Sequence, residues 1–321
     1  MDLSLFFAGT GGSVPTARRG LPAVLVRAGG DSLLFDCGEG TQRQLLRSIG
    51  LPDIDAVFLT HYHLDHWMGL PGLVKTLDLR AREKPLTIHG PPGLKALWER
   101  LRPVIGRTGY PLEVRELERH EDVAFGGYAV TAFPVAHRVE AFGYALVEDD
   151  RPGRFDAAEA ERLGVAPGPD FGRLQRGETV DGVRPEQVVG EGRTGRRVVL
   201  SGDTAPCQAV EAFAHAADVL VHEATFTEDE RDRARETGHS TARQAAEVAT
   251  DAGVRLLALT HLSTRFFPRE IRDEAREVFP ATVVPRDFDA IEVPFPERGA
   301  PSLSKAARED EAHAPPAPPA P

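Results

Sequence analysis

The segment His61-Tyr62-His63-Leu64-Asp65-His66 packs three imidazoles and one carboxylate into six consecutive positions. It directly follows the apolar run 56–59, which predicts a strand that ends in a tight turn. Imidazole nitrogens and carboxylate oxygens suit Zn²⁺ or a similar divalent ion. Such a turn can aim the first two histidines to one side and Asp65 and His66 to another, so two pairs of ligands predict two metal ions. A chance cluster would need three of only 11 histidines to fall within six residues, and we therefore prefer the metal site.

Three further candidate ligands also stand directly after apolar runs. They are His137, Asp203 and His261, which follow the runs 133–136, 198–202 and 256–260. A single histidine at a strand end is more often a hydrogen-bonded polar residue than a ligand. The repetition of one pattern favours a shared site, because side chains at the ends of adjacent strands converge on one edge of a sheet.

Short strands and a few helices must position these residues. Apolar runs bounded by Gly, Pro or Asp predict strands at 2–8, 23–27, 32–36, 56–60, 86–89, 129–134, 143–147, 197–201, 218–222 and 256–260. Helical spacing of apolar residues predicts helices at 41–49, 93–102, 207–217, 240–252 and 269–278. This order predicts two sheets covered by helices rather than one open parallel sheet.

Two segments interrupt the pattern. Residues 149–195 are rich in Pro and Gly and have weak apolar periodicity, which predicts an insertion at about 150–195 within a domain that spans 1–298. The end of the chain, 299–321, is a Pro- and Ala-rich tail with too few apolar groups to offset ordering, and we expect it to be disordered.

Composition limits the classes of function. The net charge of −11 argues against nucleic-acid binding through general basicity, so such a role needs a local patch. No run of about 18 apolar residues and no signal peptide are visible, which predicts a cytoplasmic protein without a membrane segment. The two cysteines, Cys37 and Cys207, have no metal-site spacing and are expected to be buried thiols.

Eight motifs between residues 7 and 263 give the chain a specific resemblance. The segments are Phe7–Thr16, Phe35–Gln42, His61–His66, Val139–Tyr144, Ser201–Thr204, His222–Phe226, Gly238–Thr241 and Thr260–Ser263. Together they resemble the metallo-β-lactamase superfamily and, within it, the short form of the ribonuclease Z family of tRNA 3′-processing endonucleases. The pattern at 61–66 alone would indicate only the superfamily, and the remaining motifs narrow it.

The resemblance implies a four-layer αββα sandwich that holds two Zn²⁺ per subunit. The implied ligands of one ion are His61, His63 and His137, those of the other are Asp65, His66 and His261, and Asp203 bridges the two. Two adjacent cations lower the pKa of a shared water toward ~7 and clamp the attacking and leaving oxygens of a phosphoryl displacement.

The resemblance also implies three catalytic groups. Asp65 is expected to take a proton from the attacking water, while His239, oriented by Glu223, donates one to the leaving ribose oxygen. A carboxylate such as Glu223 can instead serve packing alone. His222 is expected to be structural rather than a ligand.

The insertion resembles the flexible arm that grips the tRNA elbow in this family. It carries nine arginines against eight acidic residues between Arg151 and Arg197, so it is basic only relative to the rest of the chain. Gln175 and Arg176 stand where the family commonly has a lysine-containing motif. The implied reaction is removal of the 3′ trailer of precursor tRNA after the discriminator nucleotide, by a homodimer in which the arm of one subunit holds the tRNA that the other cleaves.

Two other functions share part of this pattern. A different superfamily phosphodiesterase or an arylsulfatase would keep the ligands but would not need the arm or the His239-Ser240-Thr241 loop. A non-catalytic, zinc-dependent RNA-binding protein would tolerate loss of ligands, whereas all the expected ligands are present.

Overall fold

Apolar strands pair into two sheets in the computed structural model, which describes residues 2–306. The first sheet has the strand order β15-β14-β1-β2-β3-β4-β5-β6. Its strands are β1 (Leu3–Gly9), β2 (Ala23–Ala28), β3 (Asp31–Phe35), β4 (Ala56–Phe58), β5 (Leu86–Gly90), β6 (Leu112–Glu116), β14 (Ala290–Glu292) and β15 (Ser302–Ser304). The pairs from β3 to β6 are parallel, so the carboxyl ends of these strands lie at one edge.

The second sheet has the strand order β13-β12-β11-β10-β9-β8-β7. Its strands are β7 (Asp122–Phe125), β8 (Tyr128–Pro134), β9 (Phe142–Glu148), β10 (Arg197–Leu200), β11 (Val219–Glu223), β12 (Leu257–Thr260) and β13 (Thr282–Val283). The strands β10 to β13 are parallel, and β9 is antiparallel to β10.

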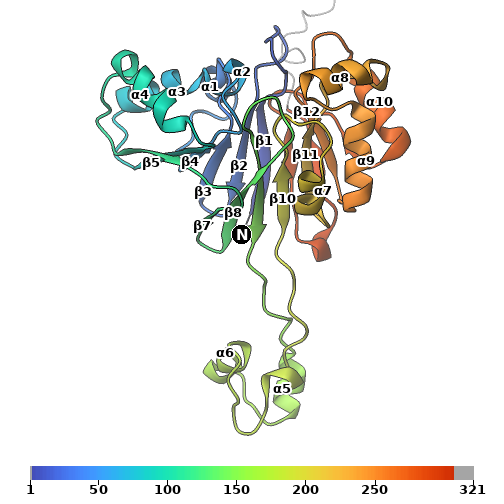
Figure 1. Ribbon diagram of the computed structural model, residues 1–321. Coiled ribbons are helices and arrows are strands. Elements are labelled where there is room, and N and C mark those ends of the chain that lie inside the picture. The colour runs from blue at the N-terminus through green and yellow to red at the C-terminus, as the bar shows by residue number, and fades with distance from the viewer. Residues whose placement is uncertain (1, 307–321) are drawn as a thin grey trace, which may run out of the picture.

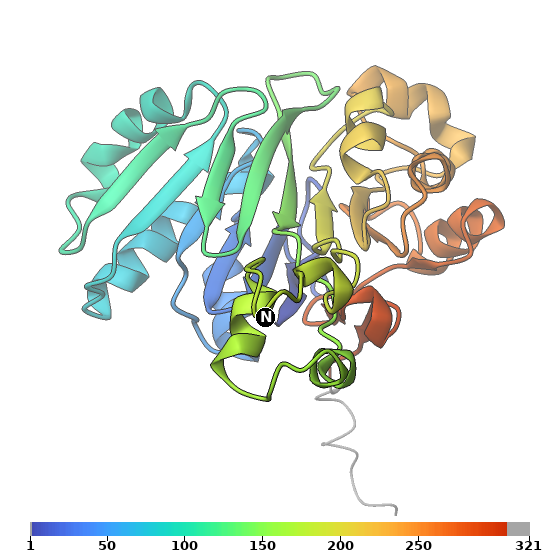
Figure 2. The same cartoon turned by 90° about the horizontal axis from the view of Figure 1, so that it is seen from below.

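Helices cover the outer face of each sheet (Figure 1, Figure 2). Beside the first sheet lie α1 (Thr41–Ser48), α2 (Leu64–Trp67), α3 (Leu70–Leu79) and α4 (Leu94–Ile105). Beside the second lie α7 (Gln208–Ala214), α8 (Arg231–Thr237), α9 (Ala242–Ala252) and α10 (Pro268–Val278). Buried residues of these helices pack with the outward side chains of the strands, so the predicted four-layer αββα sandwich is confirmed.

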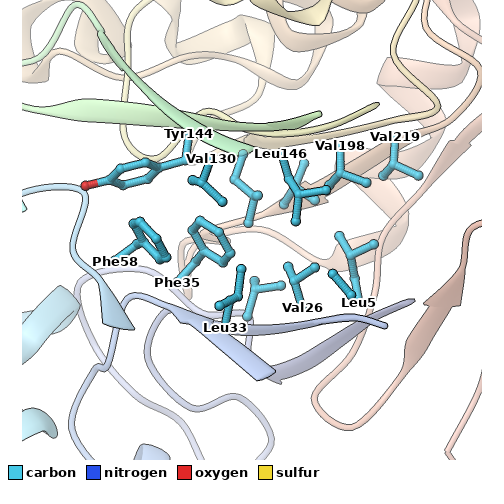
Figure 3. Packing of buried hydrophobic residues seen from close by; sticks show 14 of the residues in the cluster. Leu5, Val26, Leu33, Phe35, Phe58, Val130, Tyr144, Leu146, Val198 and Val219 are labelled. Carbon is cyan, nitrogen blue, oxygen red and sulfur yellow. The ribbon is translucent and has the colours of Figure 1, made fainter. Parts of the chain in front are cut away.

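Besides the apolar clusters under the helices, a further cluster fills the space between the two sheets. Figure 3 shows Phe35 and Phe58 of the first sheet facing Tyr144 and Leu146 of the second. Alternation along each strand explains this arrangement, because successive side chains point to opposite faces of a sheet. The hydroxyl of Tyr144 donates a hydrogen bond of 2.7 Å to the carbonyl oxygen of Leu59, directly before the histidine motif. Inter-sheet packing therefore fixes the base of the loop that begins at Thr60.

The insertion is a small folded unit at the end of a neck, which consists of two extended segments of the chain that run side by side (Figure 1). It contains α5 (Ala157–Arg162), α6 (Pro169–Gln175) and the short 3₁₀ helix η1 (Pro185–Gln187). Apolar residues from the helices and from the segments that connect and follow them form a separate core, made of Ala160, Val165, Leu174, Val180, Val183 and Val188. The insertion that the sequence predicts therefore has its own hydrophobic core, which its weak periodicity did not indicate.

A group of side chains that we call the neck clasp ties the arm to the sandwich. Arg151 and Arg193, which pair across the neck, both contact Glu297, with nitrogen–oxygen distances of 2.9 and 3.0 Å. The guanidinium of Arg151 lies 3.6 Å from the ring centroid of Phe295, and that of Arg196 lies 4.0 Å from it. The clasp thus joins both segments of the neck to the residues that follow β14.

The end of the domain differs from the prediction. The sequence predicted disorder from Gly299 onward, but Ser302–Ser304 form β15, which pairs antiparallel with β14. The sheet edge supplies backbone partners that composition cannot indicate, so the domain extends past residue 298. The rest of the predicted tail, 307–321, lies outside the described residues. Between residues 2 and 306, no helix has the length and apolar character needed to cross a membrane.

Candidate metal centre

Loops at the carboxyl ends of parallel strands bring the predicted ligands together. His61 follows β4, Asp203 follows β10 and His261 follows β12, while His137 follows the antiparallel β8. The ligand atoms form overlapping groups in which all donors lie within 4.8 Å of one another. These groups are His61, His63, His137 and Asp203; Asp65, His66 and His261; and Asp203, His239 and His261.

Three imidazoles converge in the first group. His61 Nε2 lies 2.9 Å from His63 Nδ1, which lies 3.2 Å from His137 Nε2. The remaining nitrogens of two of these rings are engaged elsewhere. His137 Nδ1 donates to the carbonyl oxygen of Gly238 at 2.8 Å, and His61 Nδ1 lies 3.0 Å from Thr60 Oγ1. His61 and His137 therefore turn unprotonated Nε2 atoms toward a common point, as ligands of a metal do.

Two more rings show the same arrangement in the second group. His66 Nδ1 lies 2.7 Å from a carboxylate oxygen of Asp36, and its Nε2 is buried with no hydrogen-bond partner among the described residues. His261 Nδ1 lies 2.8 Å from Thr225 Oγ1, and its Nε2 lies 3.4 Å from Asp65 Oδ2. The orphaned nitrogen of His66 thus faces a position that a cation would fill.

Asp203 lies between the two groups. Its Oδ2 atom is 3.8 Å from His61 Nε2, 3.3 Å from His66 Nε2 and 3.3 Å from His261 Nε2. One carboxylate oxygen therefore reaches donors of both groups, which is the placement that a bridging ligand requires.

The electrostatics of the site fit divalent cations. Burial, together with the neighbouring His66, holds the pKa of His61 well below its usual value, so that ring is neutral. Burial opposes protonation of His66, but the charges of Asp203 and Asp36 outweigh it and raise its pKa well above the usual value. The same carboxylates that favour a proton there also favour a metal ion. The donor set and its charge therefore fit two bound Zn²⁺ or similar ions.

His239 and Glu223 form a separate pair beside the ligands. His239 Nδ1 lies 2.7 Å from Glu223 Oε1. The amide of Thr204 and the hydroxyl of Thr225 also donate to this buried carboxylate, at 3.0 and 2.6 Å. Burial lowers the pKa of His239, but the charge of Glu223 and the hydrogen bond to it raise the pKa to about 9. The ring is therefore protonated at neutral pH, with Nε2–H as its remaining donor.

Unusual backbone conformations support the site. His261 and Asp36 have φ values of 56° and 58°, in the left-handed region that costs a non-glycine residue energy. Gly12 lies against the ring of His261, where an added Cβ would come 2.5 Å from Nδ1. The loop after β1 must therefore carry glycine where it supports His261.

All the predicted site residues lie together in the structure. The residues that sequence reasoning passed over are Asp36, Thr225 and Gly238, which bind the outward nitrogens of His66, His261 and His137. Their positions beside quoted motifs were the available signal. His222 is absent from the donor groups and its Nδ1 donates to the carbonyl oxygen of Glu223 at 2.7 Å. Cys37 is a free, buried thiol as predicted, whereas the free thiol of Cys207 is only partly buried, so the prediction was wrong for Cys207.

Comparison with known proteins identifies the family. The model of the metallo-beta-lactamase superfamily matches residues 19–224. A ribonuclease Z of Myxococcus xanthus is 49% identical over 304 residues, which cover 92% of this chain and 99% of that protein. A ribonuclease Z of Haloferax volcanii is 50% identical over 306 residues, covering 92% and 96% of the two chains.

A solved structure agrees with these matches. The short form of human tRNase Z superimposes with a TM-score of 0.66 at 27% identity, covering 91% of this chain and 99% of that one. About half of the residues are thus identical to those of relatives matched over nearly their whole length, on a fold that shares the same layers. The chain therefore belongs to the metallo-β-lactamase superfamily and, within it, to the ribonuclease Z family.

Proposed function

We propose that this protein is the endoribonuclease that removes the 3′ trailer of precursor tRNA. Its relatives are named ribonuclease Z, and a solved neighbour is the short form of tRNase Z. The observation that carries the proposal is the convergence of seven donor residues beside a protonated histidine, in a chain that is about half identical to those relatives. Cleavage is expected after the discriminator nucleotide, leaving a 3′-hydroxyl on the tRNA and a 5′-phosphate on the trailer.

We infer that two Zn²⁺ occupy the donor groups. His61, His63 and His137 would hold one ion, Asp65, His66 and His261 the other, and Asp203 both. When bound, the two ions supply an activated water nucleophile and positive charge beside the phosphate oxygens.

The chain's own residues supply proton transfer. His239 keeps a second proton on Nε2 at neutral pH because, against the effect of burial, the charge of Glu223 raises the pKa of the ring to about 9. Glu223 binds the Nδ1–H, so the Nε2–H is the group that donates to the leaving ribose oxygen. Asp65 keeps one oxygen occupied by the amide of Ser13, at 2.7 Å from Oδ2, and offers the other as proton acceptor. Burial raises the pKa of Asp65, but the hydrogen bond with His261 and the charges of His66 and His261 outweigh it and hold the pKa below its usual value, so Asp65 is ionised at neutral pH.

The arm is the proposed contact for the distant part of the tRNA. It stands away from the sandwich at the end of its neck, where a long substrate can reach it (Figure 1). We further propose a homodimer in the cytoplasm, in which the arm of one subunit serves the metal centre of the other.

One experiment separates this function from its rivals. Zinc-loaded protein is incubated with a 3′-extended precursor tRNA, a chromogenic phosphodiester and an aryl sulfate in parallel. Single cuts after the discriminator nucleotide support the proposal. Turnover of the small ester or sulfate without tRNA cleavage would indicate a different superfamily hydrolase, and RNA binding without cleavage would indicate a non-catalytic protein.

A further inference from the structure

A groove of about 1090 Å³ lies outside the metal centre. Its walls are the end of α1, one face of α10, and the segments 283–289 and 303–306. It opens beside the loop 13–20, whose first residue donates to Asp65 and whose Arg19 donates to the carbonyl oxygen of Pro285 at 3.0 Å. Ala17 of this loop lines the groove, so the loop connects the groove with the metal centre.

Cations without carboxylate partners gather in this groove. Among the described residues, none of the following lining cations has a carboxylate oxygen within 4.0 Å: Arg47, Arg269, Arg276, Arg286 and Lys305. Three of them have other contacts that leave the charge available. Arg47 and Arg269 lie over the rings of Phe288 and Phe267, and Arg276 donates to the carbonyl oxygen of Thr282.

The acidic residues of the groove are engaged by neutral donors. Asp287 accepts from Thr10 Oγ1 at 2.7 Å and from Gln44 Nε2 at 2.7 Å. Asp289 accepts from the amides of Arg286 and Ala306, at 2.9 and 3.1 Å. These two carboxylates therefore leave the cations open to an external anion.

The cationic surface continues into a second hollow of about 840 Å³. This hollow shares Arg47 and Arg286 with the groove and adds Arg18 and Arg43, which also have no carboxylate within 4.0 Å in the described part of the chain. Glu39 also lines the second hollow, but cations outnumber carboxylates there. The two hollows thus form one cationic surface, in a protein with a net charge of −11.

The arm offers fewer open charges than its composition suggests. Of its nine arginines, six form ion pairs within the protein. These are Arg151, Arg162, Arg173, Arg176, Arg193 and Arg196. A paired guanidinium gains less from a phosphate, because the existing contact must be broken or shared.

We propose that the cationic groove supplies most of the salt-dependent contacts with the phosphodiester backbone of the substrate RNA, beside the arm's contact with the distant part of the tRNA. Guanidinium groups match phosphate oxygens in shape and charge, and release of counterions drives such binding. The identity of the RNA rests on the proposed function. The groove supplies the electrostatic attraction that an acidic enzyme needs. The arm contributes its contact with the distant part of the tRNA.

Charge-removing variants of the zinc-loaded protein test this division. The groove variant is Arg47→Gln/Arg286→Gln. The arm variant is Arg154→Gln/Arg184→Gln, two arm arginines without a carboxylate partner among residues 2–306. The matched control is Arg80→Gln/Arg100→Gln, two exposed arginines on the far flank that likewise have no such partner in the described chain. All three pairs change the net charge equally.

The readout is the KM for precursor tRNA against salt concentration. Each lost phosphate contact reduces the steepness of log affinity against log salt concentration by ~0.7–0.9. The slope of the groove variant, which loses two contacts, should therefore be shallower by about 1.5. The control should keep the slope, and turnover of a chromogenic phosphodiester should stay unchanged in all variants. A groove variant that behaves like the control, or a slope loss confined to the arm variant, would overturn the proposal.

The test does not depend on cleavage. If the protein leaves the precursor tRNA intact, the same RNA serves as an uncleaved ligand and its Kd replaces the KM. Failure of the proposed function therefore appears as absent hydrolysis, and failure of the groove proposal appears as an unchanged salt slope.

Discussion

The Nδ1 contacts orient four of the five histidines proposed as metal ligands. Gly238, Asp36, Thr60 and Thr225 hold the outward nitrogens, so the Nε2 atoms keep their lone pairs for a cation. His63 is the exception, because its Nδ1 atom faces the other two rings. The protein therefore prepares the ligand tautomers through ordinary hydrogen bonds.

Asp203→Ala removes the oxygen shared by both donor groups. A bridging carboxylate holds two ions at ~3.5–4 Å, so its loss should reduce the bound metal from two ions toward one per chain and abolish hydrolysis without unfolding the protein. Metal analysis, circular dichroism and activity on precursor tRNA check this. Full activity with one tightly bound ion would rule out the binuclear mechanism.

His239→Ala should separate the proposed acid from the metal ligands. Both ions should remain, while the single-turnover rate falls on the order of 10²–10⁴-fold, as for a positioned general acid. Glu223→Gln should keep the ring in place but lower its pKa from about 9, so the fall in rate at high pH should begin at a lower pH. Zinc loss in parallel with activity would make His239 a ligand instead.

At the scale of single elements, β5 contains a buried ionisable group away from the ligand sets. His89 stacks on Phe58 with a centroid distance of 4.7 Å, and its buried Nδ1 has no hydrogen-bond partner among the described residues. Burial, reinforced by the charge of Arg115, lowers its pKa to about 4. The folded protein therefore binds this proton more weakly than the unfolded chain, whose histidine pKa is about 6.5.

This difference predicts a loss of stability in acid. Above pH about 6.5 both states are neutral at His89, whereas between about 6.5 and 4 only the unfolded state gains the proton. The free energy of unfolding should fall by about 2 kcal/mol at pH 5 from this group alone. His89→Phe keeps the ring and removes the titration. Urea unfolding of both proteins in EDTA at pH 5 and 7.5 measures the difference, and an equal pH dependence would contradict the assignment.

Sequence patterns identified the strands and helices with the clearest apolar runs, but they missed other strands and α-helices outside the insertion, namely α2, α3, α8, β6, β7, β13, β14 and β15. The strands before His61, Asp203 and His261 were predicted because buried parallel strands read as continuous apolar segments. β15 was missed because its three residues are held by pairing with β14 rather than by their own composition. The left-handed conformation of His261 was likewise unpredictable, because the surrounding loops impose it.

The candidate site was more predictable than the surface around it. Ligand types and spacing indicated all seven donors, since metal chemistry restricts which residues can serve. The pairing of the arm's arginines could not be read from a count of charges. Arg173, for example, contacts both Asp170 and Glu178 only because α6 and the turn after it bring them together.

At the scale of the whole molecule, we expect the neck clasp to set the direction of the arm, because it joins both sides of the neck to the sandwich. Glu297→Gln removes the charge that holds Arg151 and Arg193 while leaving the metal centre unaltered. The KM for precursor tRNA should rise several-fold at unchanged kcat, and protease should cut the neck faster. Glu297→Asp, which keeps the charge, should restore much of the affinity. A fall in kcat, or no change in cleavage of the neck by protease, would indicate that the clasp does not position the arm.

Strand β10 separates the arm from the metal centre. The neck enters at its first residue, Arg197, and Asp203 follows its last residue, Leu200, so the two lie at opposite ends of the sandwich (Figure 1). If the arm contacts the distant part of the tRNA, as proposed, we expect binding to depend on the length of the substrate, because only an RNA that extends well beyond the cleavage site would touch an arm. Deleting residues 154–189 should raise the KM for a full precursor tRNA but leave an acceptor-stem hairpin with the same trailer unaffected. An equal rise in KM for both RNAs would mean that the arm supports the fold. A rise confined to the longer RNA would mean that the length of a transcript, and not only the sequence at the cleavage site, determines whether it is processed.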